Sequence, residues 1–249
     1  ELGGKSPNIL LEDADLDAAI PGSLWATFLH QGQVCQSGTR LFAPASIHGE
    51  VLERLKVAAE KLRVGPSASQ ESDLGPLISA RQLETVDTYV KTGLKEGAKL
   101  LTGGARLTGG EYDKGHFYPP TIFYDVDNKM TIAQEEIFGP VLSVIKYDSV
   151  DEVIRLANDS IYGLGGAVWS RDIPQAIAIA RKIRTGTVWV NDFHLINGFF
   201  PFGGYKQSGI GRELGSAGIR EYQQVKHIHV DQTPRIGQKF WYMVLGVGS

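Results

Sequence analysis

An alternation of apolar runs and amphipathic stretches over residues 140–191 limits the possible folds more than any other feature of this sequence. The predicted order is strand, helix, strand, helix, strand, over residues 140–147, 149–158, 165–169, 173–184 and 186–191. Strands that alternate with helices predict a parallel sheet, because each helix returns the chain to the same edge of the sheet. We therefore expect an α/β fold in three layers, with helices on both faces of a mostly parallel sheet.

The first half of the chain extends this pattern. Leu16, Ile20, Leu24 and Phe28 recur at helical spacing and predict a helix over residues 16–31 that ends near Gly32. Pro21 indicates a start or a kink in that helix. The remaining predicted elements are a short buried strand over 39–44, helices over 48–64 and 79–97, and loops with short strands over 103–110.

Composition excludes several classes of function. The 249 residues suit one large domain or two small ones. The net charge of −3 gives no sign of a positively charged surface that would bind nucleic acid. The sequence contains no run of eighteen apolar residues, which a transmembrane helix would need, so we expect no membrane partner. A single cysteine excludes an internal disulfide and favours a reducing, cytoplasmic setting. Because residue 1 is Glu and no signal-peptide pattern follows, we expect a piece of a longer or processed chain.

The cysteine, Cys35, lies in the segment GQVCQSG at residues 32–38, on a predicted loop. Free cysteine is among the most buried residue types, which favours a structural thiol. The small and polar neighbours instead leave room for a substrate and bring backbone N–H groups near the sulfur, where they stabilise a thiolate or an oxyanion. The segment alone leaves both interpretations open.

Three further segments carry candidate chemistry. Residues 135–140 (EEIFGP) place two carboxylates before a buried strand, either as surface charges or as ligands for ribose hydroxyls. Residues 201–213 are rich in glycine, but Leu214 stands where a dinucleotide-binding loop requires its third glycine. His227 and His229 share a face of a predicted strand over 225–231, and two ligands are too few for a zinc site, so no metal is expected.

Four motifs, in order and at matching spacing, resemble the aldehyde dehydrogenase superfamily over residues 1 to about 231. They are ELGGKSP at 1–7, GQVC at 32–35, EEIFGP at 135–140 and PFGGYKQSGIGRE at 201–213. The resemblance implies oxidation of an aldehyde to a carboxylic acid with NAD or NADP as the cofactor. It leaves the aldehyde and the choice between the two cofactors open.

The resemblance also implies a role for each matching position. Cys35 corresponds to the catalytic nucleophile, Glu1 to the general base and Glu213 to a carboxylate near a proton path. The residue that holds the nicotinamide ribose corresponds to Glu136, and its cofactor-packing neighbour to Phe138. The positions that line the substrate funnel correspond to Trp25, Ile196 and Phe202.

In the implied reaction, the Cys35 thiolate adds to the aldehyde carbonyl and forms a thiohemiacetal. The Cys35 backbone N–H helps to stabilise its oxyanion, and hydride transfer to the cofactor leaves a thioester on the sulfur. Water activated by Glu1 then hydrolyses the thioester to the acid.

The resemblance divides the chain into four segments: residues 1–3 end a missing N-terminal cofactor-binding domain, 4–215 form the catalytic domain, 216–232 form an oligomerisation segment and 233–249 form an apolar tail. A strand over 222–231 is expected to join subunits into a homo-oligomer, either a dimer or a tetramer. Without the missing domain, we expect the chain alone to bind NAD poorly and to leave the reaction incomplete.

Two other functions compete with the dehydrogenase. A cofactor-free thiol esterase needs only Cys35 and a base such as Glu1. A non-catalytic assembly module needs only the 222–231 strand and the apolar tail. Trp25, Phe199 and Phe202, with Phe200, suggest an aromatic entrance suited to apolar or cationic substrates.

Overall fold

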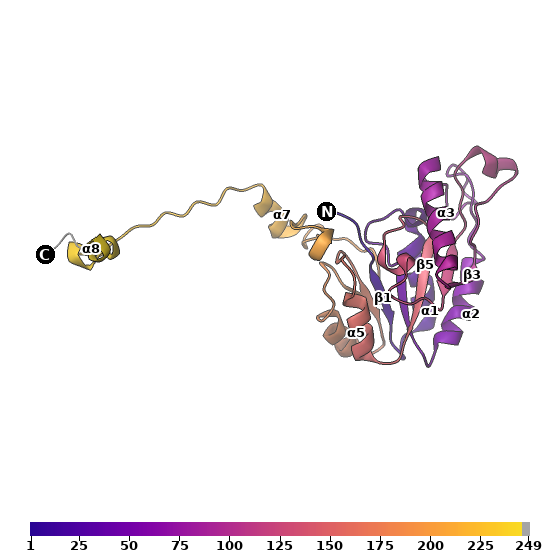
Figure 1. Cartoon of the computed structure of the whole chain (residues 1–249), viewed down its shortest axis with the longest axis horizontal. Coiled ribbons are helices and arrows are strands. Elements are labelled where there is room, and N and C mark those ends of the chain that lie inside the picture. The colour runs from indigo at the N-terminus through magenta and orange to yellow at the C-terminus, as the bar shows by residue number, and fades with distance from the viewer. Residues whose placement is uncertain (246–249) are drawn as a thin grey trace.

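Seven strands form one sheet in the order β3-β4-β5-β2-β1-β6-β7 (Figure 1). The computed structural model describes residues 1–245. The strands are β1 Pro7–Leu10, β2 Arg40–Pro44, β3 Lys99–Thr102, β4 Thr121–Tyr124, β5 Val141–Tyr147, β6 Ala167–Trp169 and β7 Trp189–Val190. Neighbouring strands are parallel throughout, except that β3 runs antiparallel to β4 at one edge. The predicted, mostly parallel sheet is confirmed.

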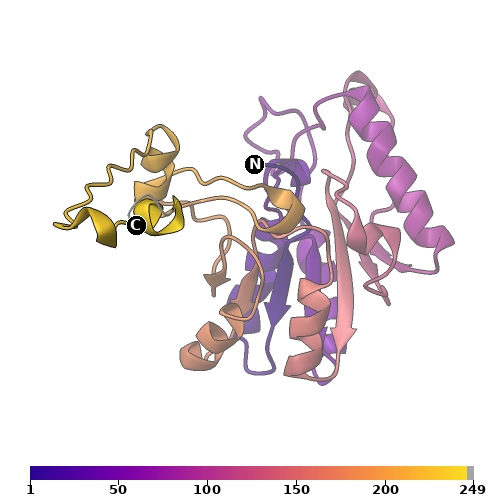
Figure 2. The ribbon, with the colours of Figure 1, turned by 60° about the vertical axis from the view of Figure 1, so that its left-hand side comes forward.

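Helices cover both faces of the sheet. The α-helices are α1 Leu16–Phe28, α2 His48–Ala59, α3 Ala80–Lys95, α4 Thr131–Gln134, α5 Val150–Asn158, α6 Ile173–Ala180, α7 Gly215–Glu221 and α8 Phe240–Leu245. Successive strand residues point to opposite faces: Leu41 packs in a core with α1 and α2, whereas Phe42 packs in a core with α3, α5 and α6. The protein therefore has the three predicted layers (Figures 1 and 2).

The helix before the cysteine is shorter than predicted. The Asp15 side chain caps the start of α1 by accepting from the backbone N–H of Asp17, and α1 ends at Phe28 rather than at residue 31. His30 and Gln31 have left-handed backbone angles, with φ of 50° and 58°, which stop the helix. Pro21 lies inside α1 and not at its start.

Sequence patterns missed three strands and misplaced some ends. β1 occupies a central position in the sheet, yet its four residues are too few to show a period. β3 and β4 were also missed, apart from the general expectation of short strands near 103–110. The helix predicted over 173–184 ends at Ala180, and the strand predicted over 186–191 contains only Trp189–Val190.

Residues 222–231 form no strand within this single chain, and the pairing of this segment with a second subunit stays a prediction. After α7 the chain extends away from the body without a neighbouring strand, and a β-ladder requires hydrogen bonds to a second backbone (Figure 1). Val225, Ile228 and Val230 are exposed along this stretch. In the predicted tail, α8 is described, and residues 246–249 lie outside the described range.

The longest helix, α3, has 16 residues. No helix within residues 1–245 combines the length and the apolar character that a bilayer crossing requires.

Candidate active site

Three of the four sequence motifs meet at the amino ends of neighbouring parallel strands. ELGGKSP leads into β1, GQVC precedes β2 and EEIFGP leads into β5. Because β1, β2 and β5 are adjacent and parallel, their entry loops lie at the same end of the strands. The fourth motif, at 201–213, follows β7 and returns to this end, where its Ser208 contacts the first motif.

The two glycines of the first motif permit close contact with the other two loops. The Gly4 backbone N–H donates to Glu136 Oε1 at 3.0 Å. A Cβ at Gly3 would lie 2.4 Å from Glu136 Oε2, and a Cβ at Gly4 would lie 2.2 Å from the Cys35 carbonyl oxygen. Neither distance allows a larger side chain, so the Gly-Gly pair brings the Cys35 turn and the Glu136 loop together.

Ser208 ties the fourth motif to the first. Its hydroxyl donates to the Gly3 carbonyl oxygen at 2.7 Å and accepts from the Gly163 backbone N–H at 2.9 Å. The Leu2 backbone N–H donates to the Ser208 carbonyl oxygen at 2.9 Å. Ser208 is fully buried, so these bonds are shielded from competing water. The position of Glu1 therefore depends on a segment about two hundred residues later in the chain.

Cys35 lies in a turn between α1 and β2 and is partly exposed, not sealed in a core. Burial, followed by the negative charges of Glu1 and Glu136, raises the pKa of the Cys35 thiol, and the backbone N–H groups of Gln36 and Cys35 oppose that rise. The thiol therefore needs a base to become a nucleophile.

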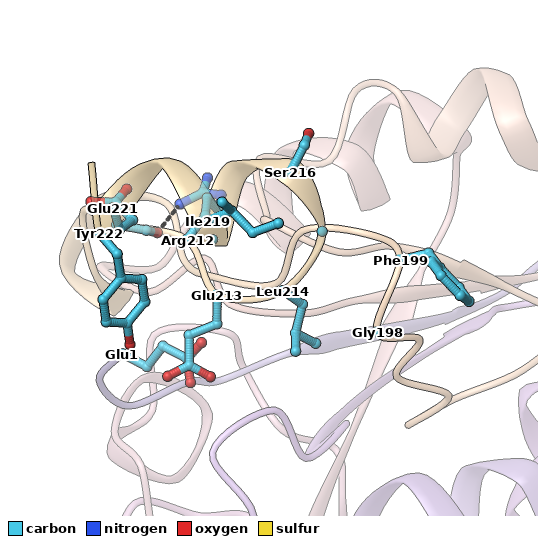
Figure 3. A pocket seen from close by; sticks show the side chains of 13 residues that line it. Glu1, Gly198, Phe199, Arg212, Glu213, Leu214, Ser216, Ile219, Glu221 and Tyr222 are labelled. Atoms are coloured by element: carbon cyan, nitrogen blue, oxygen red, sulfur yellow. Dashed lines mark hydrogen bonds between the residues drawn. The ribbon is translucent and has the colours of Figure 1, made fainter. Parts of the chain in front are cut away.

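Glu1 and Glu213 form a pair of like charges. Both line a pocket of about 940 Å³, together with Phe199 and Tyr222, and Figure 3 shows the two carboxylates pointing toward one another. Burial and then the charge of Glu213 raise the pKa of Glu1. A carboxylate with a raised pKa is a stronger base, which suits proton abstraction near neutral pH.

Glu136 could accept a hydrogen bond from a sugar hydroxyl, and Phe138 could pack against a planar ring. Glu136 is half-buried, and one of its oxygens accepts from Gly4, which leaves the second oxygen to accept from a hydroxyl donor such as a ribose. Phe138 is 38% exposed, and both its backbone φ of 56° and a bond from Gln82 Nε2 to its carbonyl fix its position. These residues fit the nicotinamide riboside portion of NAD or NADP.

The three residues assigned to the substrate funnel differ in how exposed they are. Trp25 is half-exposed on α1, and its ring lies edge-on to His194 at 6.1 Å between centroids. Ile196 is exposed on the loop after β7. Phe202 is only 7% exposed, and its backbone pairs with that of Glu213. Their shared role in substrate binding stays a prediction.

Sequence reasoning missed two polar residues beside the cysteine. Gln36 Nε2 lies 2.9 Å from His194 Nδ1, and His194 Nε2 lies 2.9 Å from the Ala26 carbonyl oxygen. Both contacts join segments that are far apart in the sequence, so no local pattern could reveal them. The single available signal was a histidine within the aromatic stretch after a predicted strand.

The first motif also buries a lysine. Lys5 is 2% exposed, and its amine has no hydrogen-bond partner. Burial, followed by the positive charge of Arg40, lowers the pKa of Lys5 to about 7. Arg40 is also buried, but it donates to the carbonyl oxygens of Lys5, Leu156 and Ala157 and to Asn128 Oδ1.

Replacing Lys5 by methionine is expected to change how stability depends on pH. In the unfolded chain this lysine titrates near pH 10.4, so between about pH 7 and 10.4 the unfolded state binds more protons than the folded state. The free energy of unfolding of the wild-type chain therefore rises with pH over this range. Lys5→Met should remove that rise and stabilise the chain at pH 7 by roughly 1–2 kcal/mol. Urea unfolding at pH 7 and pH 9 measures both effects.

Lys91→Met is the matched control, because the Lys91 side chain is 73% exposed and pairs with Asp87 on the surface. Its slope of stability against pH should equal that of the wild type. An unchanged slope in Lys5→Met as well would mean that the Lys5 amine is hydrated and charged in the folded chain.

Comparison with known proteins agrees with the four motifs. Residues 1–228 match the model of the aldehyde dehydrogenase family. A betaine aldehyde dehydrogenase from Bacillus subtilis (strain 168) is 50% identical over 234 residues, which are 94% of this chain and 48% of that protein. A betaine aldehyde dehydrogenase from Brucella melitensis is 47% identical over 93% of this chain and 47% of that protein.

Solved structures resemble the fold closely. The complex of Staphylococcus aureus betaine aldehyde dehydrogenase with NAD+ superposes with a TM-score of 0.91 at 42% identity, over 96% of this chain and 48% of that one. A Mycobacterium tuberculosis aldehyde dehydrogenase complexed with NAD+ gives a TM-score of 0.87 at 49% identity, over 90% and 46%. The present chain spans about half the length of the relatives it matches.

Proposed function

The chain belongs to the aldehyde dehydrogenase family, and from this premise we propose that it carries the thiol and the base of an NAD(P)-dependent aldehyde oxidation. One observation carries the proposal: Gly3 and Gly4, which follow Glu1, pack against both Glu136 and the Cys35 carbonyl oxygen. The proposed nucleophile, base and ribose ligand thus come from loops at the same end of the strands.

The residues divide the chemistry between them. Glu1 takes the proton of the Cys35 thiol, and the thiolate adds to the aldehyde carbonyl to give a thiohemiacetal. The backbone N–H groups of Cys35 and Gln36 lie beside the sulfur. There they stabilise the thiolate, and then the oxyanion of the thiohemiacetal. The cofactor supplies the hydride acceptor when it is bound. Glu1 must first release the thiol proton to solvent, and it then removes a proton from the water that hydrolyses the Cys35 thioester.

Glu213 and the cofactor residues have supporting roles. The charge of Glu213 raises the pKa of Glu1 and makes it the better base. Glu136 Oε2 would accept from the nicotinamide ribose, and Phe138 would pack beside the ring. NAD+ is bound in the similar structures from Staphylococcus aureus and Mycobacterium tuberculosis, which supports NAD or NADP here.

A small cationic aldehyde of the betaine aldehyde type is the substrate we propose. The similar proteins from Bacillus subtilis and Brucella melitensis are betaine aldehyde dehydrogenases. The half-exposed ring of Trp25 supports a positively charged substrate, because aromatic faces attract quaternary ammonium groups.

We also propose a homo-oligomer, either a dimer or a tetramer, in a reducing, cytoplasmic setting. Exposed Val225, Ile228 and Val230 lie on an extended segment whose backbone is available to pair with a second subunit. A reducing compartment would keep Cys35 in its thiol form.

Glu1→Gln separates the two halves of the reaction. The thioester should still form, although more slowly, while its hydrolysis should fall by about 10²- to 10⁴-fold because the water loses its base. With the native protein, betaine aldehyde and NAD+, rapid-mixing absorbance should show a burst of about one NADH per site, and mass spectrometry should show the acyl group on Cys35.

Glu12→Gln is the control, because this carboxylate follows β1 and lies at the opposite end of the strands. The substitution should leave the steady rate unchanged. A Glu1→Gln variant that turns over at the wild-type rate would contradict the role of Glu1. Absence of NADH formation by the wild-type protein with every aldehyde tested would contradict the dehydrogenase itself.

A further inference from the structure

His194 joins the cysteine turn to the helix that precedes it. The ring lies between Gln36 Nε2, at 2.9 Å from Nδ1, and the Ala26 carbonyl oxygen, at 2.9 Å from Nε2. Ala26 lies near the end of α1, and Gln36 directly follows Cys35. The same Ala26 carbonyl also accepts from the Gly38 backbone N–H at 2.9 Å. One imidazole therefore bridges the two ends of the segment that carries the cysteine.

The partners determine which ring nitrogen carries the proton. A carbonyl oxygen only accepts, so the hydrogen lies on His194 Nε2 and points to Ala26. In the neutral ring, Nδ1 then has a lone pair, and it accepts from the Gln36 amide nitrogen. Gln36 is 3% exposed and its Oε1 has no partner, so the amide is held by this one bond.

Aromatic packing fixes the ring in place. The His194 ring lies edge-on to Phe193 at 4.9 Å and to Trp25 at 6.1 Å. Its backbone φ of 68° is in the left-handed region, which a non-glycine residue adopts when its surroundings hold it there. The geometry of the ring is therefore set by α1 and by the loop after β7, and not by the cysteine turn.

We infer that His194 is a positioning residue for Cys35: in its neutral form it holds Gln36, and through Gln36 it fixes the turn that presents the thiol. This inference rests on the proposed function only in taking Cys35 as the nucleophile. A chain without dehydrogenase activity would still show the tether in the reactivity of the thiol.

Protonation should release the tether. A charged imidazole carries hydrogens on both nitrogens, so Nδ1 can no longer accept from the Gln36 amide. The amide must rotate to present Oε1, which moves its nitrogen into a buried position without an acceptor. Burial, and then the charge of His30, lower the pKa of His194, whereas the bond to Ala26 and the charge of Asp192 raise it, and the balance favours the neutral ring near neutral pH.

The test measures the rate at which iodoacetamide alkylates Cys35, which is the only cysteine in the 249-residue chain. The rate is followed from pH 5.5 to 9 by peptide mass spectrometry and is divided by the thiolate fraction. In the wild type, this corrected rate should rise in a step as the pH falls and His194 becomes protonated. His194→Phe keeps a flat ring without the hydrogen bonds, and it should remove the step and raise the rate at pH 7.5 by about five- to tenfold, as expected for the loss of one hydrogen bond.

Gln36→Met provides a second variant that leaves the ring intact and removes only the amide. It should reproduce the His194→Phe profile, and the double variant should add nothing further, because both changes remove the same bond. His194→Asn, whose Oδ1 can accept at the place of Nδ1, should restore much of the slow wild-type rate. Leu195→Ala, a change at an exposed neighbouring residue, is the control and should leave the profile unchanged.

Two results would overturn the inference: a wild-type profile without the step, or additive effects of His194→Phe and Gln36→Met. If the step and the coupling appear while the native protein oxidises no aldehyde, the tether stands and the proposed function fails. If aldehyde is oxidised but the two variants alkylate like the wild type, the proposed function stands and the tether fails.

Discussion

Cys35→Ala should lower aldehyde oxidation by the native protein by about 10³-fold or more, because no other thiol in this chain can form the thiohemiacetal. The side chain lies in a partly exposed turn, and the change removes one sulfur atom, so the fold should be retained. NADH absorbance measures the activity, and circular dichroism confirms the fold. Binding of NAD+ should persist, since Glu136 and Phe138 are unchanged.

Ser37→Ala is a suitable control two residues away. The Ser37 hydroxyl is buried without a partner, so its removal should leave both folding and activity near the wild-type values. If Cys35→Ala retained more than a few per cent of the activity, the nucleophile would have to be another group, and the assignment of Cys35 would fail. Loss of activity together with unfolding would be resolved by Cys35→Ser, which keeps the size of the side chain.

Gly32→Ala is expected to destabilise the chain by about 2–4 kcal/mol, the sum of a strained backbone and a steric clash. The φ of Gly32 is 72°, in the left-handed region, and an added Cβ would lie 2.1 Å from the Gly139 carbonyl oxygen. That oxygen belongs to the loop that carries Glu136, so relief of the clash must separate the Cys35 turn from this loop. Urea unfolding should show a lower midpoint.

Gly49→Ala is the matched control for this prediction. Gly49 lies within α2, and an added Cβ would meet nothing within 4 Å. Alanine is a better helix former than glycine, so stability should be unchanged or should rise by up to about 1 kcal/mol. Equal stabilities of Gly32→Ala and Gly49→Ala would show that the two loops do not depend on the close contact at Gly32.

The layers of the fold could be predicted because their signals are local. The helices near 48–64, 79–97 and 149–158 each carry an apolar face, and the buried strand that ends at Tyr147 is rich in valine, leucine and isoleucine. β1 escaped prediction because its four residues, Pro7–Leu10, carry no period, although neighbours on both sides place it inside the sheet. Its burial is a tertiary property and not a property of its composition.

The end of α1 shows a second limit. Apolar spacing predicted a helix to residue 31, but the side chains of His30 and Gln31 do not reveal that both adopt left-handed angles. That turn holds Gly32 against Gly139 and so depends on a loop more than a hundred residues away. The strand expected over 222–231 met a similar limit, because its alternation is real but a ladder needs a partner backbone.

The candidate site was assembled by resemblance more than by local pattern. The residue types at Cys35, Glu1 and Glu136 each had an ordinary structural interpretation, and only the order and spacing of four motifs joined them. Gln36 and His194 belong to no motif that was recognised, so their contact became visible only in three dimensions. Distant pairs of this kind are the part of a site that one sequence conceals.

The bond from Ser208 to the Gly3 carbonyl has a consequence for the order of folding. It joins residues 205 positions apart, and it fixes the segment that begins with Glu1. During synthesis, β1 and the cysteine turn leave the ribosome long before Ser208 is made, so the thiol and the base cannot be set in register until nearly the whole segment has emerged. Contacts of such long range form late and slowly. A chain released before residue 208 would hold the Cys35 thiol without a fixed position for Glu1. The appearance of activity would therefore report the completion of folding.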